Sequence, residues 1–337
     1  MKREPGLDLL RVVGVLFVVS LHQFLYNGFY SQPQTGLLVW VADSFRWLFF
    51  CCNGIFIMLT GYLKSPKAFS QTYYRSLVPI LVGYVLCCVI IFPLQSQMID
   101  EVLSPGQWLD KFVGFGNYAW YVEMYIGLML ISPLLNLALT QIRDGKQLLM
   151  AAGVFVTLSA LPSVTRLNLI PDYWTSLYPV TYYVLGAVIR RLQPKVKVWQ
   201  GLGLAMMTCM FLGLLSLAST DKGFSSGFTQ GYGGFWTTVV AVFVFLGLYR
   251  VQLGKSMSGL FAWLAEGCYE GFMLSLIFDL WAYDLVRQWH TPEKWLLVYV
   301  CVTIPILVTS LLLGKLIHKI SLGVTNLLPG FRNKAGV

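Results

Sequence analysis

The sequence predicts an all-α protein, a polytopic bundle of transmembrane helices, and two observations carry that prediction. Of its 337 residues, 57% are hydrophobic and only 12% are charged, and the mean hydropathy is +0.67. This composition excludes an ordinary soluble domain. Apolar segments long enough to cross a bilayer recur from one end of the chain to the other. We therefore expect a single transmembrane domain over residues 1–337.

About ten segments have the length and hydropathy of membrane spans, and the connections between them leave no room for a separate soluble domain. They are expected at residues 8–28, 44–63, 77–94, 118–139, 147–162, 176–190, 199–217, 235–250, 258–282 and 296–317. The first is too long for the apolar core of a signal peptide and no cleavage site follows it, so we expect it to be retained. An even number of spans places both termini on the same side.

The distribution of positive charge predicts which side that is. The net charge is +9, and if the amino terminus is inside, seventeen Lys and Arg residues lie in the segments on that side. The opposite loops hold five: Lys111, Arg166, Lys222, Arg287 and Lys294. This bias predicts cytoplasmic termini in a multi-pass protein of a bacterial plasma membrane. The basic excess is thus a topology signal and a contact for anionic membrane lipid, and we expect no nucleic-acid partner.

The first segment carries two ionisable residues on one helical face. Arg11 and His22 are eleven residues apart, which in a helix is three turns and a rise of roughly 16 Å. Asp8 precedes Arg11 by three residues, so an ion pair between these two is expected. His22 lies at hydrocarbon depth, where an ionisable side chain is by default a functional hypothesis. A histidine that is merely hydrogen-bonded between helices is the alternative.

Two further residues complete a candidate site around this face. Glu123, in the fourth segment, lies at the same predicted level as His22 and could orient it as a general base. Arg75 opens the third segment on the cytoplasmic side, where it could join Arg11 in a cationic mouth suited to phosphates. The positive-inside bias alone also places arginines there.

The outer half of the predicted bundle contains polar and aromatic side chains that could contact a ligand. Arg46 lies near the outer end of the second segment, and Asn53 lies at mid-depth, where it could stabilise an oxyanion. Trp120 and Tyr121 open the fourth segment and are typical of an interfacial belt or of a platform for a sugar ring.

The sequence leaves the roles of the other buried polar groups open. Glu266 and Glu270 are four residues apart and share a helical face, as an internal brace or a proton path would require. The seven cysteines fall inside predicted spans without metal-ligand spacing, so we expect packing cysteines and no metal.

Four motifs, taken in order, resemble the acyltransferase-3 family of integral membrane acyltransferases. They are L-D-L-L-R followed by ten residues and His (7–22), CCNGIFIMLTGYL (51–63), YRSLVPIL (74–81) and NYAWYVEMYIGLMLISPLLN (117–136). The resemblance covers nearly the whole chain. One departure is Leu276, where many members have a second histidine.

The resemblance implies transfer of an acyl group, usually acetyl, from cytoplasmic acyl-CoA to a hydroxyl of an extracytoplasmic glycan or exopolysaccharide. It makes acetyl-CoA the co-substrate and His22 and Arg11 the essential pair. Arg75 and Asp8 are then also expected on the side of the protein that binds the donor. Tyr125 joins Trp120 and Tyr121 as a substrate-binding candidate through the W-Y-x-x-x-Y pattern. His22 would either deprotonate the acceptor or carry the acyl group itself.

Two other classes of function stay open at this point. A transporter or exporter would use buried Arg, His and Glu side chains as a proton or substrate path, although the chain lacks an internal repeat. A membrane binding module of the same fold would keep the architecture without catalysis. The acceptor, the acyl chain and any homo-oligomer are not readable from the sequence.

Overall fold

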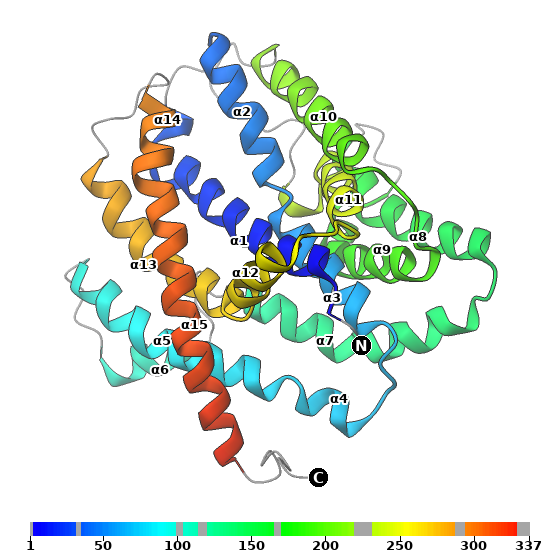
Figure 1. Cartoon of the computed structure of the whole chain (residues 1–337), viewed down its shortest axis with the longest axis horizontal. Helices are drawn as coiled ribbons and strands as arrows, with labels where there is room; N and C mark the ends of the chain where they lie inside the picture. The colour runs from blue at the N-terminus through cyan, green and yellow to red at the C-terminus, as the bar shows by residue number, and fades with distance from the viewer. Residues whose placement is uncertain are drawn as a thin grey trace.

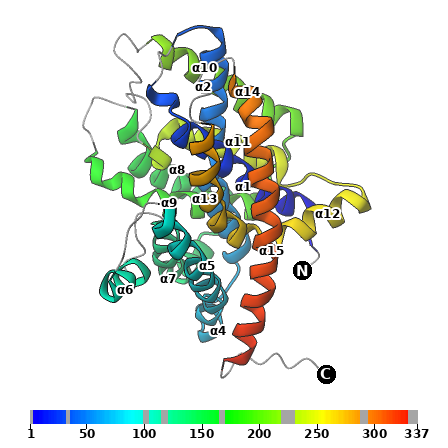
Figure 2. The same cartoon turned by 90° about the vertical axis from the view of Figure 1, so that its left-hand side faces the viewer.

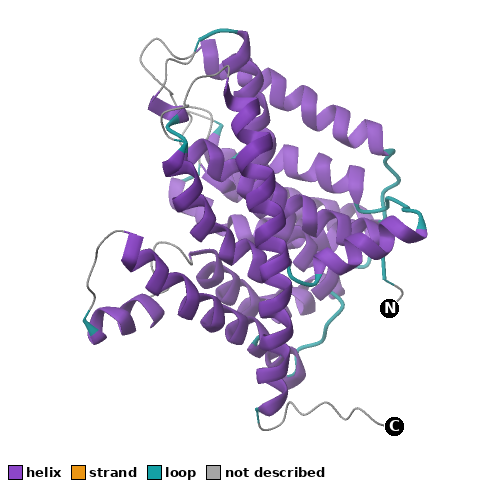
Figure 3. Ribbon diagram, turned by 60° about the vertical axis from the view of Figure 1, so that its left-hand side comes forward, coloured by secondary structure: helices purple, strands orange, loops and turns teal. Residues whose placement is uncertain are grey.

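The protein is an assembly of helices joined by loops (Figure 1), seen in a computed structural model that describes residues 3–31, 35–98, 104–113, 120–164, 170–218, 231–286 and 294–328. Within these ranges there is no strand, as Figure 3 shows. In chain order the helices are α1 Pro5–Tyr26, η1 Phe29–Ser31, α2 Leu37–Phe49, α3 Cys52–Lys64, α4 Gln71–Arg75, α5 Val78–Met98, α6 Pro105–Val113, α7 Trp120–Gln141, α8 Gly145–Ala160, η2 Leu161–Ser163, η3 Asp172–Leu177, α9 Tyr178–Leu192, α10 Val198–Ala218, η4 Gly231–Gly233, α11 Phe235–Leu248, α12 Lys255–Ala265, α13 Cys268–Leu285, α14 Trp295–Val298, η7 Tyr299–Thr303 and α15 Ile304–Leu327. The predicted all-α fold is therefore confirmed.

All ten predicted segments are helical, but fewer have the length of a full membrane crossing. In the described part of the chain seven helices are long and apolar enough to span, or eight if α12 and α13 form one span. The predicted segments at 176–190 and 235–250 correspond to α9, with 15 residues, and α11, with 14. At about 1.5 Å per residue these helices are shorter than the roughly 30 Å of a hydrocarbon core.

Two predicted segments are each built from two helices. The second consists of α2 and α3, which meet at Phe50 and Cys51 and together make a candidate span of 28 residues. The ninth consists of α12 and α13, bent by 66° where Glu266 and Gly267 interrupt the helix. Hydropathy alone does not reveal such bends, because both arms are apolar.

α1 is the central helix of the bundle. Figure 1 shows it in the middle, with α13 and α15 on one side and α9, α10 and α11 on the other. In its most apolar window 61% of the residues are buried, against 28% in α8 and in α10. Leu10, Val15 and Val19 have no exposed area. A helix that is apolar all round belongs inside the protein, whereas α8 and α10 turn exposed apolar side chains outward, as lipid-facing helices do.

α13 and α15 cross with their backbones in contact, and two glycines allow it. A Cβ atom on Gly271 would come within 2.9 Å of Ser310 O, and one on Gly314 would overlap Gly271 N. Such close approach through small residues is typical of helix pairs in membranes. Figure 2 shows α13 beside the upper part of the long helix α15.

Candidate active site

His22 of α1 and Asp279 of α13 form a buried hydrogen-bonded pair. His22 Nδ1 lies 2.5 Å from Asp279 Oδ2; the His22 side chain is 19% exposed and the Asp279 side chain is fully buried. When Asp279 is ionised it can only accept, so that Nδ1 then carries the shared proton and Nε2 is the basic nitrogen. A carboxylate in this position fixes the imidazole tautomer and stabilises the imidazolium, which is what a general base requires.

Polar contacts hold α1 against the neighbouring helices on either side of His22. The Ser20 and Tyr299 hydroxyls are 3.1 Å apart, and Thr303 Oγ1 donates to Gln23 Oε1 at 3.1 Å. Tyr299 and Thr303 are the two ends of η7, a π-helical turn within the long helix that ends in α15. π-helical turns of this kind are frequent at functional sites. Here the turn fixes the part of α1 that presents His22.

Two matching rows of side chains extend from this pair toward the other end of the bundle. Each row has the spacing i, i+4, i+7 and i+11, which keeps its members on one helical face. The rows are Arg11, Val15, Val18 and His22 on α1, and Cys268, Phe272, Ser275 and Asp279 on α13. α1 packs against α13, so the two rows have one end at the His22–Asp279 pair and the other at Arg11 and Cys268.

A cavity of about 300 Å³ lies at the Arg11 end of the two rows. Both Arg11 and Cys268 line it. The other charged or titratable side chains in its wall, besides tyrosines, are Lys64, Glu266, Glu270 and His318. The rest of the wall is mainly apolar and aromatic, and His22 is not part of it. An apolar cavity with a few convergent polar groups has the character of a small-molecule site.

Asp8 holds the Arg11 guanidinium at this cavity. Arg11 Nη1 donates to Asp8 Oδ1, which confirms the expected ion pair, and Arg3 Nε donates to Asp8 Oδ2 at 2.6 Å. The Asp8 side chain is only 2% exposed. Its hydrogen bond raises the pKa of Arg3 above the ordinary value. One buried carboxylate therefore serves two guanidinium groups.

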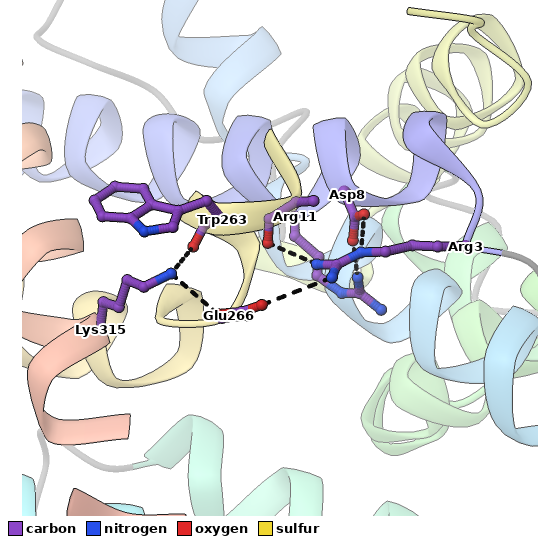
Figure 4. A network of polar contacts seen from close by, with 7 residues as sticks. Arg3, Asp8, Arg11, Trp263, Glu266 and Lys315 are labelled. Atoms are coloured by element: carbon purple, nitrogen blue, oxygen red, sulfur yellow. Dashed lines mark hydrogen bonds and ion pairs between the residues drawn. The ribbon is translucent and has the colours of Figure 1, made fainter. Parts of the chain in front are cut away.

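The network continues across the bend between α12 and α13, as Figure 4 shows. Arg3 Nη1 lies 3.7 Å from Glu266 Oε1, and Lys315 Nζ donates to Glu266 Oε2 at 3.0 Å. Glu270 has a separate partner, since His318 Nδ1 lies 2.9 Å from Glu270 Oε1. The two acidic residues of predicted span nine thus each have a basic partner, as a structural brace would.

The cation that joins Arg11 at the cavity is Lys64. Arg75, predicted for this position, is the last residue of the short helix α4; its side chain is exposed and is not part of the cavity wall. Lys64, the last residue of α3, lines the cavity and donates to Ser76 Oγ at 3.0 Å. A positive-inside bias places many Lys and Arg residues at the cytoplasmic level of the membrane. Only the packing of the helices decides which of them lines the cavity.

The expected contact between His22 and Glu123 is absent, and that part of the prediction is wrong. Glu123 is exposed on α7, and Asp279 occupies the place beside His22. α1 packs instead against α13, α3 and α12. Equal depth in the membrane is compatible with many pairs of neighbours, and the sequence does not select one. The predicted catalytic role of Glu123 depended on this contact, and Glu123→Gln tests it.

The two polar residues predicted from span two are both buried. The Arg46 side chain is 2% exposed, its Nε donates to Asp43 Oδ1 at 2.5 Å, and its guanidinium lies 5.3 Å from the centre of the Trp47 ring. Asn53 is 3% exposed, and its side chain lies within hydrogen-bonding reach of Tyr232. Both residues are therefore held inside the bundle.

The rings of the predicted aromatic platform contact one another, and Trp120 meets Tyr121 edge-to-face with ring centres 6.0 Å apart. Trp120 stacks on Tyr232, with ring centres 5.1 Å apart. Tyr121 and Tyr125 stack on each other at 6.2 Å and line the cavity that also contains Arg11. These two tyrosines thus belong to the Arg11 side of the bundle.

The described part of the chain contains no group of three or more His, Cys, Asp or Glu side chains that could hold a metal ion. All seven cysteines are unbonded; six are buried and Cys301 is exposed.

The sequence comparisons place this membrane-spanning architecture in a known class. The family described as acyltransferase domain matches residues 4–315, nearly the whole chain. The chain belongs to the acyltransferase-3 family and is a multi-pass membrane acyltransferase. Comparison with curated proteins and with solved structures gives no match.

Proposed function

We propose that the protein is an O-acetyltransferase that moves an acetyl group from acetyl-CoA on the cytoplasmic side to a hydroxyl of an extracytoplasmic glycan. The His22–Asp279 pair is the observation that carries this proposal. A histidine with one nitrogen bonded to a buried carboxylate and the other available has the properties of a general base for an alcohol. The charge bias assigns the Arg11 end to the cytoplasm.

The proposed step balances in protons and bonds. His22 Nε2 removes the proton of the acceptor hydroxyl, whose oxygen attacks the thioester carbon. The new C–O ester bond forms as the C–S bond breaks, and the proton passes from the imidazolium to the leaving thiolate. Asp279 stabilises the imidazolium in between. The buried amide of Asn53 is a candidate donor to the oxyanion.

The cavity suits the donor on three counts. Arg11 and Lys64 supply positive charge for phosphate groups. About 300 Å³ of mainly apolar space suits a narrow pantetheine arm better than a bulky nucleotide. The rise from Arg11 to His22, roughly 16 Å, is comparable to the length of that arm. Binding of the nucleotide at the Arg11 end would thus direct the thioester toward His22.

Transfer of radiolabelled acetyl from acetyl-CoA tests the proposal. Purified protein in liposomes would be offered exopolysaccharide, lipid-linked glycan, teichoic-type polymer or peptidoglycan as acceptor. We expect His22→Ala to lower the transfer rate about 100- to 10,000-fold, the usual contribution of a general base. Tyr26→Phe is the matched control, because this exposed ring lies 5.7 Å from the His22 ring and Phe keeps it.

The alternative functions and mechanisms predict different results with the same preparation. Unchanged turnover in His22→Ala would remove His22 from the mechanism. Movement of a glycan across the membrane without acetyl-CoA would indicate a transporter. An acetylated His22 peptide, found by mass spectrometry before acceptor is added, would replace direct attack by an acyl-histidine intermediate.

A further inference from the structure

Three aromatic rings in the cavity wall come from three different helices. Phe56 of α3, Tyr121 of α7 and Phe272 of α13 all line the cavity. The Tyr121 ring centre lies 5.5 Å from that of Phe272 and 6.3 Å from that of Phe56, and both contacts are edge-to-face. Three elements that are distant in the sequence thus contribute one layer of rings.

The layer lies between the Arg11 end and the His22 end of the two rows. On α13, Phe272 precedes Asp279 by seven residues on the same face, which is about 10 Å of rise. On α1, the Phe56 ring fills the space left by Gly14, where a Cβ atom would come within 2.7 Å of Phe56 Cζ. Gly14 follows Arg11 by less than one turn and precedes His22 by eight residues.

Buried side chains occupy the rows beyond the rings. Val15 and Ser275 have no exposed area, and Val18 is 4% exposed. Phe56 packs with Val15 in one apolar cluster. Phe272 packs in that cluster and also in the cluster that contains Val18. A packed interior of this kind has few voids larger than a water molecule. A thioester in the cavity therefore meets the ring layer before it can reach His22.

We propose that Phe56, Tyr121 and Phe272 form a gate that admits short acyl groups to His22 and restricts longer ones. The identity of the passing group rests on the proposed function, whereas the closure rests on the packing of the three rings alone. Each added methylene must displace more of a close-packed layer. Pockets that exclude a single methylene discriminate by about 10- to 200-fold in kcat/KM.

A series of acyl-CoA donors tests the gate through selectivity. We expect the wild type to prefer acetyl-CoA over butyryl-CoA, and Phe56→Ala and Phe272→Ala each to raise the butyryl-to-acetyl ratio of kcat/KM at least about tenfold. Gly14→Ala should shift the ratio in the same direction, since its methyl group displaces the Phe56 ring. Phe155→Ala, a partly buried ring on α8 that packs in a different cluster, should leave the ratio unchanged.

A thiol-labelling experiment tests the closure without any enzymatic turnover. A membrane-impermeant thiol reagent is added at the Arg11 side, and labelled peptides are identified by mass spectrometry in Val18→Cys protein. Cys268, which lines the cavity, reports that the reagent has entered. We expect Cys268 to be labelled in both backgrounds and the introduced cysteine to be labelled only when Phe56→Ala is added.

The two experiments separate failure of the gate from failure of the proposed function. If no acyl-CoA is turned over, the proposed function is rejected and the labelling result alone judges the gate. If acetyl and butyryl groups are transferred equally well by the wild type, or if position 18 is labelled with all three rings intact, the gate is overturned while the transferase remains. Unchanged selectivity in all three variants would overturn it as well.

Discussion

The ionisable residues at the two ends of α1 are paired in different ways. At the His22 end, one fully buried carboxylate, Asp279, serves one imidazole. At the Arg11 end, Asp8 and Glu266 are shared among three cations whose side chains range from nearly buried to half exposed. A single isolated pair fixes one nitrogen atom in one position. A shared network neutralises charge but allows a cation to exchange partners when an anionic ligand arrives.

The largest effect should come from breaking the isolated pair. We expect Asp279→Asn to lower kcat about 100-fold or more, with the KM for acetyl-CoA changed less than about twofold, because an amide stabilises the imidazolium poorly. Steady-state acetyl transfer measures both constants. Glu123→Gln on exposed α7 is the matched carboxylate-to-amide control and should stay within about twofold. The reverse order of the two variants would restore Glu123 as the partner of His22.

An intermediate effect is expected from the cations of the Arg11 end, and it should appear in donor binding. A charge-assisted hydrogen bond contributes about 1.5–3 kcal/mol, so Arg11→Ala and Lys64→Ala should each raise the KM for acetyl-CoA about tenfold or more. Arg75→Ala removes an exposed cation outside the cavity wall and should change that KM less than about twofold. Equal losses in Lys64→Ala and Arg75→Ala would mean that the donor extends beyond the cavity.

The smallest effect should follow loss of Arg3, which tests whether the shared network tolerates removal of one member. The Arg3 side chain is 52% exposed and Asp8 keeps Arg11 as a partner. Arg3→Ala should therefore cost at most about 1 kcal/mol of unfolding free energy in detergent, and less at high salt. Lys255→Ala, at an exposed position opening α12, is the control. A loss of several kcal/mol that salt does not reduce would show that the network is rigid.

The sequence predicted the helices and the local contacts of α1 but not its long-range partners. Hydropathy located ten helical segments, and helical spacing gave the Asp8–Arg11 pair, because both depend on neighbouring residues in the chain. The number of full crossings stays a prediction, since apolar composition does not distinguish a 14-residue helix such as α11 from a complete span.

The main residue missed was Asp279, and a signal for it was available. It lies inside the predicted span 258–282, and an ionisable residue at that depth is a functional hypothesis for the same reason that His22 is. Its distance from Cys268 equals the distance from Arg11 to His22, but the equality has meaning only once α1 and α13 are known to pack together. The His318–Glu270 pair was not predicted either, because the two residues lie far apart in the sequence.

The backbone contact between α13 and α15 makes the proposed chemistry depend on two glycines, Gly271 and Gly314, which have no Cβ atom. α13 carries both Asp279 and Glu270, so its distance from α15 and α1 sets the geometry at both ends of the molecule. Alanine at Gly271 or Gly314 would wedge the two helices apart. Loss of activity would therefore follow from a substitution that alters neither charge nor polarity.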